Sequence, residues 1–165
     1  MNIRLAEDHK IDTIMELYKA VVKEMNANGL FNWDEKYPSR EIVEKDIKNK
    51  CLYVFEEEGT IVGLSAIDEK ADEVYKCVHW HEKTSFFSFH RIAVHPNFHG
   101  RGYAKKIIAF AEELGKKRGY KSMRIDAYCK NEKAIGLYEK LGYERVGEVF
   151  LRDLQEPCYC YEKEL

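Results

Sequence analysis

The stretch Phe89–Ala104, which reads FHRIAVHPNFHGRGYA, decides the fold of this chain. Its apolar segment Ile92–Val94 is typical of a strand, and Pro96 ends that strand because proline cannot donate to a ladder. A turn with Gly100 and Gly102 then opens an amphipathic helix. Without a Cβ, glycine lets backbone N–H groups approach an anion, and the helix N-terminus adds a favourable dipole. The order of strand, glycine turn and helix therefore predicts a phosphate or pyrophosphate site.

Hydrophobic periodicity around this stretch predicts the remaining elements. Strands are expected at Asn2–Leu5, Cys51–Phe55, Thr60–Ile67, Phe86–Val94, Ser122–Tyr128, Tyr143–Leu151 and Cys158–Lys163. Helices are expected around Ile11–Met25, Ile42–Ile47 (capped by Ser39), Gly102–Arg118 and Ala134–Leu141. The strand–helix–strand unit requires a parallel pair, whereas the hairpins require antiparallel ones. We expect one α/β domain over residues 1–165, with a mixed, mostly antiparallel central sheet and helices on both faces.

Size, charge and cysteine content narrow the classes of function. The chain has 165 residues, enough for one sizeable core, and a net charge of −2. General nucleic-acid binding needs a concentrated basic surface, which this charge does not favour. Five cysteines, an odd number without Cys-x-x-Cys spacing, favour reduced thiols. The N-terminus has no apolar signal region, and no run approaches the ~18 apolar residues of a membrane span. We expect a cytoplasmic protein that binds neither nucleic acid nor membrane.

A second motif begins just before the helix near residue 134. Its members are Asn131, Ala134, Leu137, Tyr138, Leu141, Gly142 and Tyr143. It resembles the pattern Asn-x-x-Ala-x-x-Leu-Tyr-x-x-x-Gly-(Phe/Tyr) of the GNAT superfamily of acyl-CoA-dependent N-acetyltransferases. The run His99–Ala104 resembles that family's pyrophosphate loop, (Arg/Gln)-x-x-Gly-x-(Gly/Ala), and the two motifs follow in the family's order. The detailed likeness covers Phe89–Gly147, and the strand order extends it over nearly the whole chain.

The resemblance implies acetyl-CoA as cosubstrate, no metal, and a sheet in which one parallel strand pair splays apart. Pantetheine would lie in that gap on the main chain of Ile92, Ala93 and Val94, where an N–H near Ile92 would stabilise the oxyanion. The other implied cofactor contacts are His99, Gly100, Arg101, Gly102, Tyr103, Ala104, Lys105 and Asn131. His99 departs from the family's Arg or Gln, but an imidazole still donates one hydrogen bond, so we expect cofactor binding to be retained.

The resemblance also implies a general acid, the residue that donates a proton during the transfer. Tyr138 stands at the family's position for the group that protonates the departing CoA thiolate. A phenol can do this because the ordinary pKa values of phenol and thiol, ~10 and ~8.5, are close. The alternative is a core residue, since Tyr138 lies on the apolar stripe of its helix. Asn131 would cap that helix, with or without a cofactor contact.

The sequence leaves open which residue is the general base. His90 lies on the strand that leads into the loop, and a histidine suits proton acceptance near neutral pH. Alternatively, His90 is a strand residue without a catalytic role. A carboxylate such as Glu69, acting through water, is an equal candidate.

The segment Leu30–Pro38 is rich in aromatic residues. In the family this region often lines the acceptor pocket, which would make Phe31, Trp33 and Tyr37 substrate-binding residues. Nearby carboxylates would favour a cationic amine. The alternative is that the aromatic rings only hold the loop against the core.

One cluster suggests a metal site. Cys77, His79 and His81 alternate as residues on one face of a strand do. No fourth ligand is evident, and the resembled family needs no metal. We therefore expect no metal site.

These expectations combine into one activity, the direct transfer of acetyl from acetyl-CoA to a primary amine of a small molecule. Two alternatives stay open: a protein or peptide amine as acceptor, and a non-catalytic acyl-CoA-binding sensor. Many members of the family pair through their C-terminal strands, so Val149–Tyr161 is the segment that would form a homodimer.

Overall fold

The computed structural model describes all 165 residues, which form two compact units. The first unit comprises Met1–Ile67 and His90–Ala109, and the second comprises Asp68–Phe89 and Phe110–Leu165. One strand and one helix, β4 and α3, contribute residues to both units. The expectation of one domain over residues 1–165 stays a prediction.

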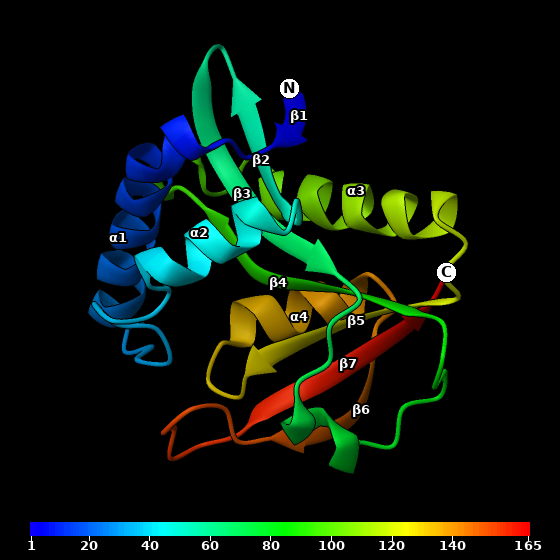
Figure 1. Ribbon diagram of the computed structural model, residues 1–165. Helices are drawn as coiled ribbons and strands as arrows, with labels where there is room; N and C mark the ends of the chain where they lie inside the picture. The colour runs from blue at the N-terminus through cyan, green and yellow to red at the C-terminus, as the bar shows by residue number, and fades with distance from the viewer. The chain divides into compact units, whose positions relative to one another are not determined.

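Seven strands follow one another in the order β1-β2-β3-β4-β5-β7-β6 (Figure 1). They are β1 (Asn2–Leu5), β2 (Leu52–Glu57), β3 (Thr60–Asp68), β4 (Phe86–Val94), β5 (Ser122–Tyr128), β6 (Glu144–Val149) and β7 (Cys158–Glu164). Strands β1, β2 and β3 pair antiparallel in turn, as do β5 with β7 and β6 with β7. Strands β4 and β5 form a parallel pair. The predicted α/β class and mixed sheet are confirmed, with strand ends displaced by one or two residues.

Four helices complete the fold. They are α1 (Ile11–Ala27), α2 (Arg40–Lys48), α3 (Tyr103–Lys117) and α4 (Glu132–Lys140). Ser39 caps α2 by accepting the Ile42 N–H at 3.3 Å, and Asn131 caps α4 by accepting the Ala134 N–H at 3.1 Å. Both caps are predicted by the sequence and confirmed. Among these helices none combines the length and apolar character that crossing a bilayer requires.

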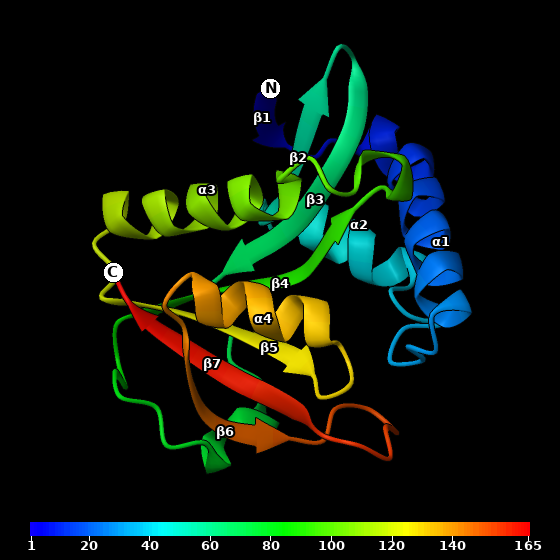
Figure 2. The same cartoon turned by 180° about the vertical axis from the view of Figure 1, so that it is seen from behind.

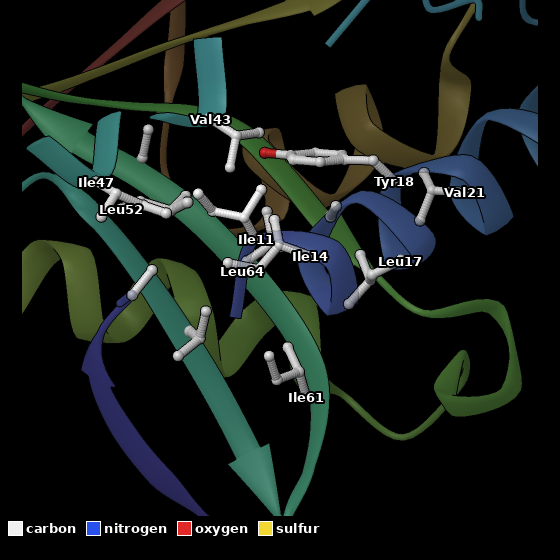
Figure 3. Close-up of a cluster of buried hydrophobic side chains, with 14 residues drawn as sticks. Ile11, Ile14, Leu17, Tyr18, Val21, Val43, Ile47, Leu52, Ile61 and Leu64 are labelled. Carbon is white, nitrogen blue, oxygen red and sulfur yellow. The ribbon is translucent and has the colours of Figure 1, made fainter. Parts of the chain in front are cut away.

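The core of the first unit lies between its helices and its strands. Figure 3 shows side chains of α1, α2, β2 and β3 gathered in one cluster. Ile14 of α1, Val54 of β2 and Leu64 of β3 have no exposed surface, and Val43 of α2 is 1% exposed. Each such side chain contributes about 1.5–3 kcal/mol when removed from water. This cluster therefore fixes α1 and α2 on one face of the strands.

The opposite face of the first unit depends on Gly63 of β3. A Cβ at this position would lie 2.8 Å from Ile107 Cδ1 of α3 and 2.9 Å from the Ala93 carbonyl oxygen of β4. Only glycine allows this close approach, because any Cβ would overlap both atoms. Gly63 thus brings the beginning of α3 and the end of β4 against β3.

The second unit carries helices on one face of its strands. Figure 2 shows α4 lying over β5 and β7. Tyr138 of α4 meets Tyr161 of β7 edge-on, with ring centroids 6.0 Å apart. A Cβ at Gly115 of α3 would lie 3.3 Å from Met123 Cε and 3.5 Å from Phe87 Cδ1. The end of α3 and helix α4 therefore cover the same side-chain layer.

The segment after β3 covers the other face of the second unit. The Tyr75 hydroxyl donates to Asp126 at 2.8 Å, and the Arg124 guanidinium lies 4.1 Å from the centroid of the Trp80 ring. Glu162, which is 3% exposed, accepts hydrogen bonds from backbone and side-chain donors around it. These contacts hold a long irregular segment in one conformation.

The interpretation of Cys77, His79 and His81 as one face of a strand was wrong. Cys77 ends the 3-10 turn Glu73–Cys77, and the backbone after it is irregular. The packing of Trp80 near Tyr75, with ring centroids 6.3 Å apart, decides this backbone path. No group of three or more His, Cys, Asp or Glu side chains is placed to hold a metal ion.

From the close approach of Gly63 to β4 and α3 we can predict how a side chain at this position affects stability. The substitution Gly63→Ala should lower the free energy of unfolding by about 1–3 kcal/mol, because the new Cβ overlaps a backbone oxygen that cannot move aside easily. Urea unfolding followed by circular dichroism measures this change.

Gly136→Ala is the matched control. A Cβ there meets no atom within 4 Å, and alanine in the interior of α4 should raise the free energy of unfolding by about 0.5–1 kcal/mol. An equal loss in both variants would contradict the role given to Gly63.

Candidate functional site

The parallel pairing of β4 is short. Phe86–Ser88 align with Ser122–Arg124 of β5, and the pairing covers only these three residue pairs. Strand β4 itself continues to Val94. The last residues of β4 therefore extend beyond its parallel ladder, as a splayed pair requires.

In the first unit, the end of β4 presents a free edge. The His95 N–H donates to the Val62 carbonyl at 2.9 Å, and the Ala93 carbonyl also faces β3. Main-chain groups alternate in direction along a strand. The N–H and C=O groups of Ile92 and Val94 therefore point to the edge opposite β3, where no other strand of this unit lies. Of these groups, the Val94 carbonyl oxygen lies 2.9 Å from His99 Nε2.

The regular course of β4 is interrupted just before Ile92. Arg91 has a φ of 49°, in the left-handed region that L-residues with a Cβ disfavour. The His90 carbonyl accepts from the Ser65 hydroxyl at 3.0 Å, and the Arg91 carbonyl accepts from the Tyr18 hydroxyl at 3.4 Å. Side-chain hydroxyls thus bind two consecutive carbonyls at this bend.

The Arg91 guanidinium is buried beside a buried carboxylate. Its side chain is 16% exposed and its Nη2 pairs with Asp46 of α2, whose residue is 6% exposed. Burial disfavours the Arg91 charge, but the oxygens of Tyr18 and Asp46 favour it, and the net effect raises the pKa of Arg91 above its ordinary value. Arg91 Nε is buried without an acceptor. Arg91 is therefore a permanent charge whose hydrogen bonds are incomplete.

The glycine turn leaves a row of backbone donors without protein partners. The N–H groups of residues 100–105 donate to no protein atom, and the first N–H that does so beyond them is that of Lys106, to the Gly102 carbonyl at 3.1 Å. Gly100 and Gly102 have φ angles of 76° and 75°, which explains why glycine stands at both positions. Six consecutive donors at the start of α3, together with the helix dipole, form a site suited to an anion.

His99 is held by protein groups on both sides. Its Nε2 lies 2.9 Å from the Val94 carbonyl oxygen, and its Nδ1 lies 3.1 Å from Glu24 Oε2 of α1. Both ring nitrogens are therefore engaged, and the imidazole ties the turn to α1 and to the end of β4.

Cationic side chains surround the free donors. The Arg101 guanidinium lies 5.2 Å from the centroid of the Phe98 ring, and Lys106 Nζ lies 4.9 Å from that of Tyr103. Arg101, Lys105 and Lys106 are exposed. These charges add to the positive potential at the start of α3.

The aromatic segment has an inner and an outer part. Trp33 meets Tyr18 and Tyr37 edge-on, with ring centroids 5.8 Å and 6.2 Å apart, and packs against the core of the first unit. Asp34 Oδ1 closes a turn by accepting the Tyr37 N–H at 2.9 Å. Phe31 is 65% exposed. Of the three aromatic residues, Phe31 is the exposed one, while Trp33 and Tyr37 hold the loop.

Tyr138 in the second unit is a buried residue. The residue is 3% exposed, and its ring meets Phe89 edge-on, with centroids 6.0 Å apart. Burial first, and the nearby Asp126 second, raise the pKa of Tyr138 above its ordinary value, so the phenol keeps its proton. No hydrogen bond joins its hydroxyl to a protein atom, and this oxygen is not one of the fully buried polar atoms without a partner. The hydroxyl is therefore available to a ligand.

Most of the expected site residues belong to the first unit. They are His90, Ile92–Val94, His99–Lys105 and the aromatic residues Phe31, Trp33 and Tyr37. The second unit holds Tyr138 and Asn131. His90 is half-buried, and its carbonyl is the group that binds Ser65.

Sequence reasoning missed Tyr18, Asp46, Arg91 and Glu24. A signal for Asp46 exists, because Val43, Asp46 and Ile47 follow the spacing of one helix face, and all three are buried. A carboxylate on that face indicates a buried partner. Nothing in the sequence names Arg91 as that partner.

The chain matches the family model described as "Acetyltransferase (GNAT) family" over residues 14–143. An acetyltransferase of Yersinia pestis is 27% identical over 152 residues, which are 92% of this chain and 93% of that protein.

Solved structures resemble the chain over nearly its full length. The crystal structure of a GNAT-family acetyltransferase from Streptococcus agalactiae has a TM-score of 0.86 and 30% identity, covering 99% of this chain and 95% of that one. That of the PaiA N-acetyltransferase from Thermoplasma acidophilum, in complex with coenzyme A, has a TM-score of 0.74 and 17% identity, covering 99% and 98%. The second likeness concerns the fold alone.

Because the Tyr138 hydroxyl makes no hydrogen bond to a protein atom, we can predict how its removal affects stability. Tyr138→Phe should change the free energy of unfolding by less than about 1 kcal/mol, because no protein hydrogen bond is lost. Tyr143→Phe, which removes the hydrogen bond to Glu112 at 3.0 Å, should cost about 1–2 kcal/mol. Denaturant unfolding measures the free energy of unfolding of both variants. A larger loss of this free energy in Tyr138→Phe than in Tyr143→Phe would show that the Tyr138 hydroxyl has a structural partner.

Proposed function

Because the chain belongs to the GNAT family of acetyltransferases, we propose that it transfers acetyl from acetyl-CoA directly to a primary amine of a small molecule. The observation that carries this proposal is the row of free N–H donors over residues 100–105 at the start of α3. A row of this kind suits the diphosphate of CoA. The coenzyme A complex of the Thermoplasma protein, which shares the fold, supports the same ligand.

The first unit would bind the cosubstrate. The donors of residues 100–105 would bind the diphosphate, with Arg101 and Lys105 as further cations, and Asn131 is a candidate contact from the second unit. Pantetheine amides would add to the free edge of β4 at Ile92–Val94, as a strand adds to a sheet edge. The thioester carbonyl would then accept from the Ile92 N–H, which stabilises the negative charge that develops on its oxygen.

The transfer would proceed in one displacement. The amine nitrogen attacks the thioester carbonyl carbon, a base removes a proton from that nitrogen, and the carbon–sulfur bond breaks. Tyr138 would donate its proton to the departing thiolate, a role supported by its free hydroxyl. His90 is our candidate base, and Glu69 acting through water is the alternative.

The acceptor amine would be bound by the aromatic segment. Phe31 offers exposed aromatic surface, and Trp33 and Tyr37 fix the loop that carries it. We place the reaction in the cytoplasm, in agreement with five cysteines that form no disulfide. A homodimer through Val149–Tyr161 is part of the same proposal.

The free donors can be tested by one glycine substitution. Gly102→Ala should raise the Kd for acetyl-CoA about tenfold, because alanine disfavours the φ of 75° and turns the N–H groups away from the phosphates. Isothermal titration with acetyl-CoA measures this Kd.

Gly59→Ala is the matched control, since Gly59 has a φ of 78° in the β2–β3 hairpin and equally open surroundings. It should lose similar stability without losing affinity. If both variants bind acetyl-CoA with the same affinity, the diphosphate does not bind at this turn.

The activity itself is tested by thiol release from acetyl-CoA with polyamines, amino sugars, amino acids and short peptides. At least one small amine should be acetylated, and Tyr138→Phe should lower kcat by about 100-fold or more with little change in the KM for acetyl-CoA. Preference for peptides would favour a protein acceptor. Tight acetyl-CoA binding without thiol release would favour a sensor.

A further inference from the structure

We propose that Tyr18, Arg91 and Asp46 are positioning residues of the transfer reaction. Together they fix the peptide group between Arg91 and Ile92, and so aim the Ile92 N–H at the thioester carbonyl. This inference rests on the proposed function, and it concerns residues that do not themselves touch the reacting atoms.

The geometry of one peptide group carries the first step. The Arg91 carbonyl and the Ile92 N–H belong to the same planar peptide unit and point in opposite directions. The Tyr18 hydroxyl of α1 donates to that carbonyl at 3.4 Å. By holding the carbonyl, Tyr18 fixes the direction in which the Ile92 N–H points.

The backbone at Arg91 explains why this peptide needs holding. A φ of 49° within a strand is a conformation that a residue with a Cβ keeps only when its surroundings impose it. The Ser65 hydroxyl holds the preceding carbonyl, that of His90, at 3.0 Å. Both carbonyls at the bend are thus held from outside the strand.

The ion pair with Asp46 supplies the third constraint. It ties the Arg91 side chain to α2, while Tyr18 ties its main chain to α1. Buried ion pairs contribute little net stability relative to apolar side chains, and Arg91 Nε has no acceptor at all. What the pair does is hold the side chain of the residue at which β4 bends, and a φ of 49° needs such a constraint.

Two substitutions test the proposal. Tyr18→Phe and Asp46→Asn should each lower kcat about 10- to 100-fold, while the Kd for CoA stays within about twofold. Removing one oxyanion donor costs about 100- to 1,000-fold, and here the donor is only misaligned. The kinetics use acetyl-CoA with the amine that the wild-type protein acetylates fastest in the panel above.

A spectroscopic readout needs no acceptor amine. A hydrogen bond to the thioester oxygen lowers its carbonyl stretching frequency, so bound [1-¹³C]acetyl-CoA should absorb below the free compound in isotope-edited infrared spectra. In Tyr18→Phe and Asp46→Asn this band should move back toward the position of free acetyl-CoA.

Each variant has a matched control. Tyr143→Phe also removes the hydroxyl of a buried tyrosine, and Glu56→Gln also weakens a partly buried pair, with Arg4 at 2.8 Å. Tyr143 meets Phe89 of β4 only through its ring, with centroids 5.9 Å apart, and phenylalanine keeps that ring. Glu56 lies on β2 and pairs with Arg4 of β1. Both controls should therefore keep the wild-type band and kcat. If the variants and controls lose kcat and shift the band equally, the effect is general destabilisation and the inference is overturned.

The remaining outcomes separate the inference from the function it rests on. Wild-type protein that binds no acetyl-CoA overturns both. Wild-type protein that binds acetyl-CoA and transfers acetyl, with an unchanged infrared band and kcat in Tyr18→Phe and Asp46→Asn, overturns the inference alone.

Discussion

Strand β4 has a parallel neighbour over its first three residues only, and the features of the candidate site follow from that limit. Every backbone N–H and C=O needs a partner when it is buried. Beyond Ser88 the main-chain groups on the edge opposite β3 are left without a ladder. A pantetheine arm, which carries amide groups of its own, is a chemically suitable partner for such an edge. The free donors of residues 100–105 follow directly along the chain and extend the same unpaired backbone into an anion site.

Each unit holds one buried carboxylate beside an arginine. In the second unit Glu162 accepts from the Ser122 hydroxyl at 2.9 Å and from the His81 N–H at 2.7 Å, and it lies 3.7 Å from Arg124 Nε. In the first unit Asp46 pairs with Arg91. The Nε atoms of both arginines are buried without an acceptor. What distinguishes the first unit is the backbone of its arginine, since Arg91 has a φ of 49° and strained residues are typical of functional sites.

Position 99 holds a histidine where the family usually has Arg or Gln, and the structure gives this histidine a role in the turn. Its imidazole contacts the Val94 carbonyl and the Glu24 carboxylate and therefore fixes the turn. The anion site then depends on backbone groups and on the exposed cations Arg101 and Lys105. These backbone donors do not depend on the side chain at position 99, which makes this part of the site tolerant of the departure.

Periodicity, caps and glycine positions were sufficient to predict the elements of the fold, because these are local properties of the backbone. Ser39 and Asn131 show this well: each caps the helix that follows it, and each is recognisable from its place before an apolar stripe. The interpretation of Cys77–His81 failed for the opposite reason. Alternation of residue types suits a strand, but the packing of Trp80 near Tyr75 decides the path of the backbone there.

The sequence by itself determined the class of the fold, the glycine turn before α3 and the positions of Tyr138 and Asn131, since each is written in the spacing of neighbouring residues. Only the tertiary structure decided that Asp46 pairs with Arg91 and that Tyr18 holds the Arg91 carbonyl. These contacts join residues that are 45 and 73 positions apart. Such relations arise from packing between elements, which no local pattern encodes.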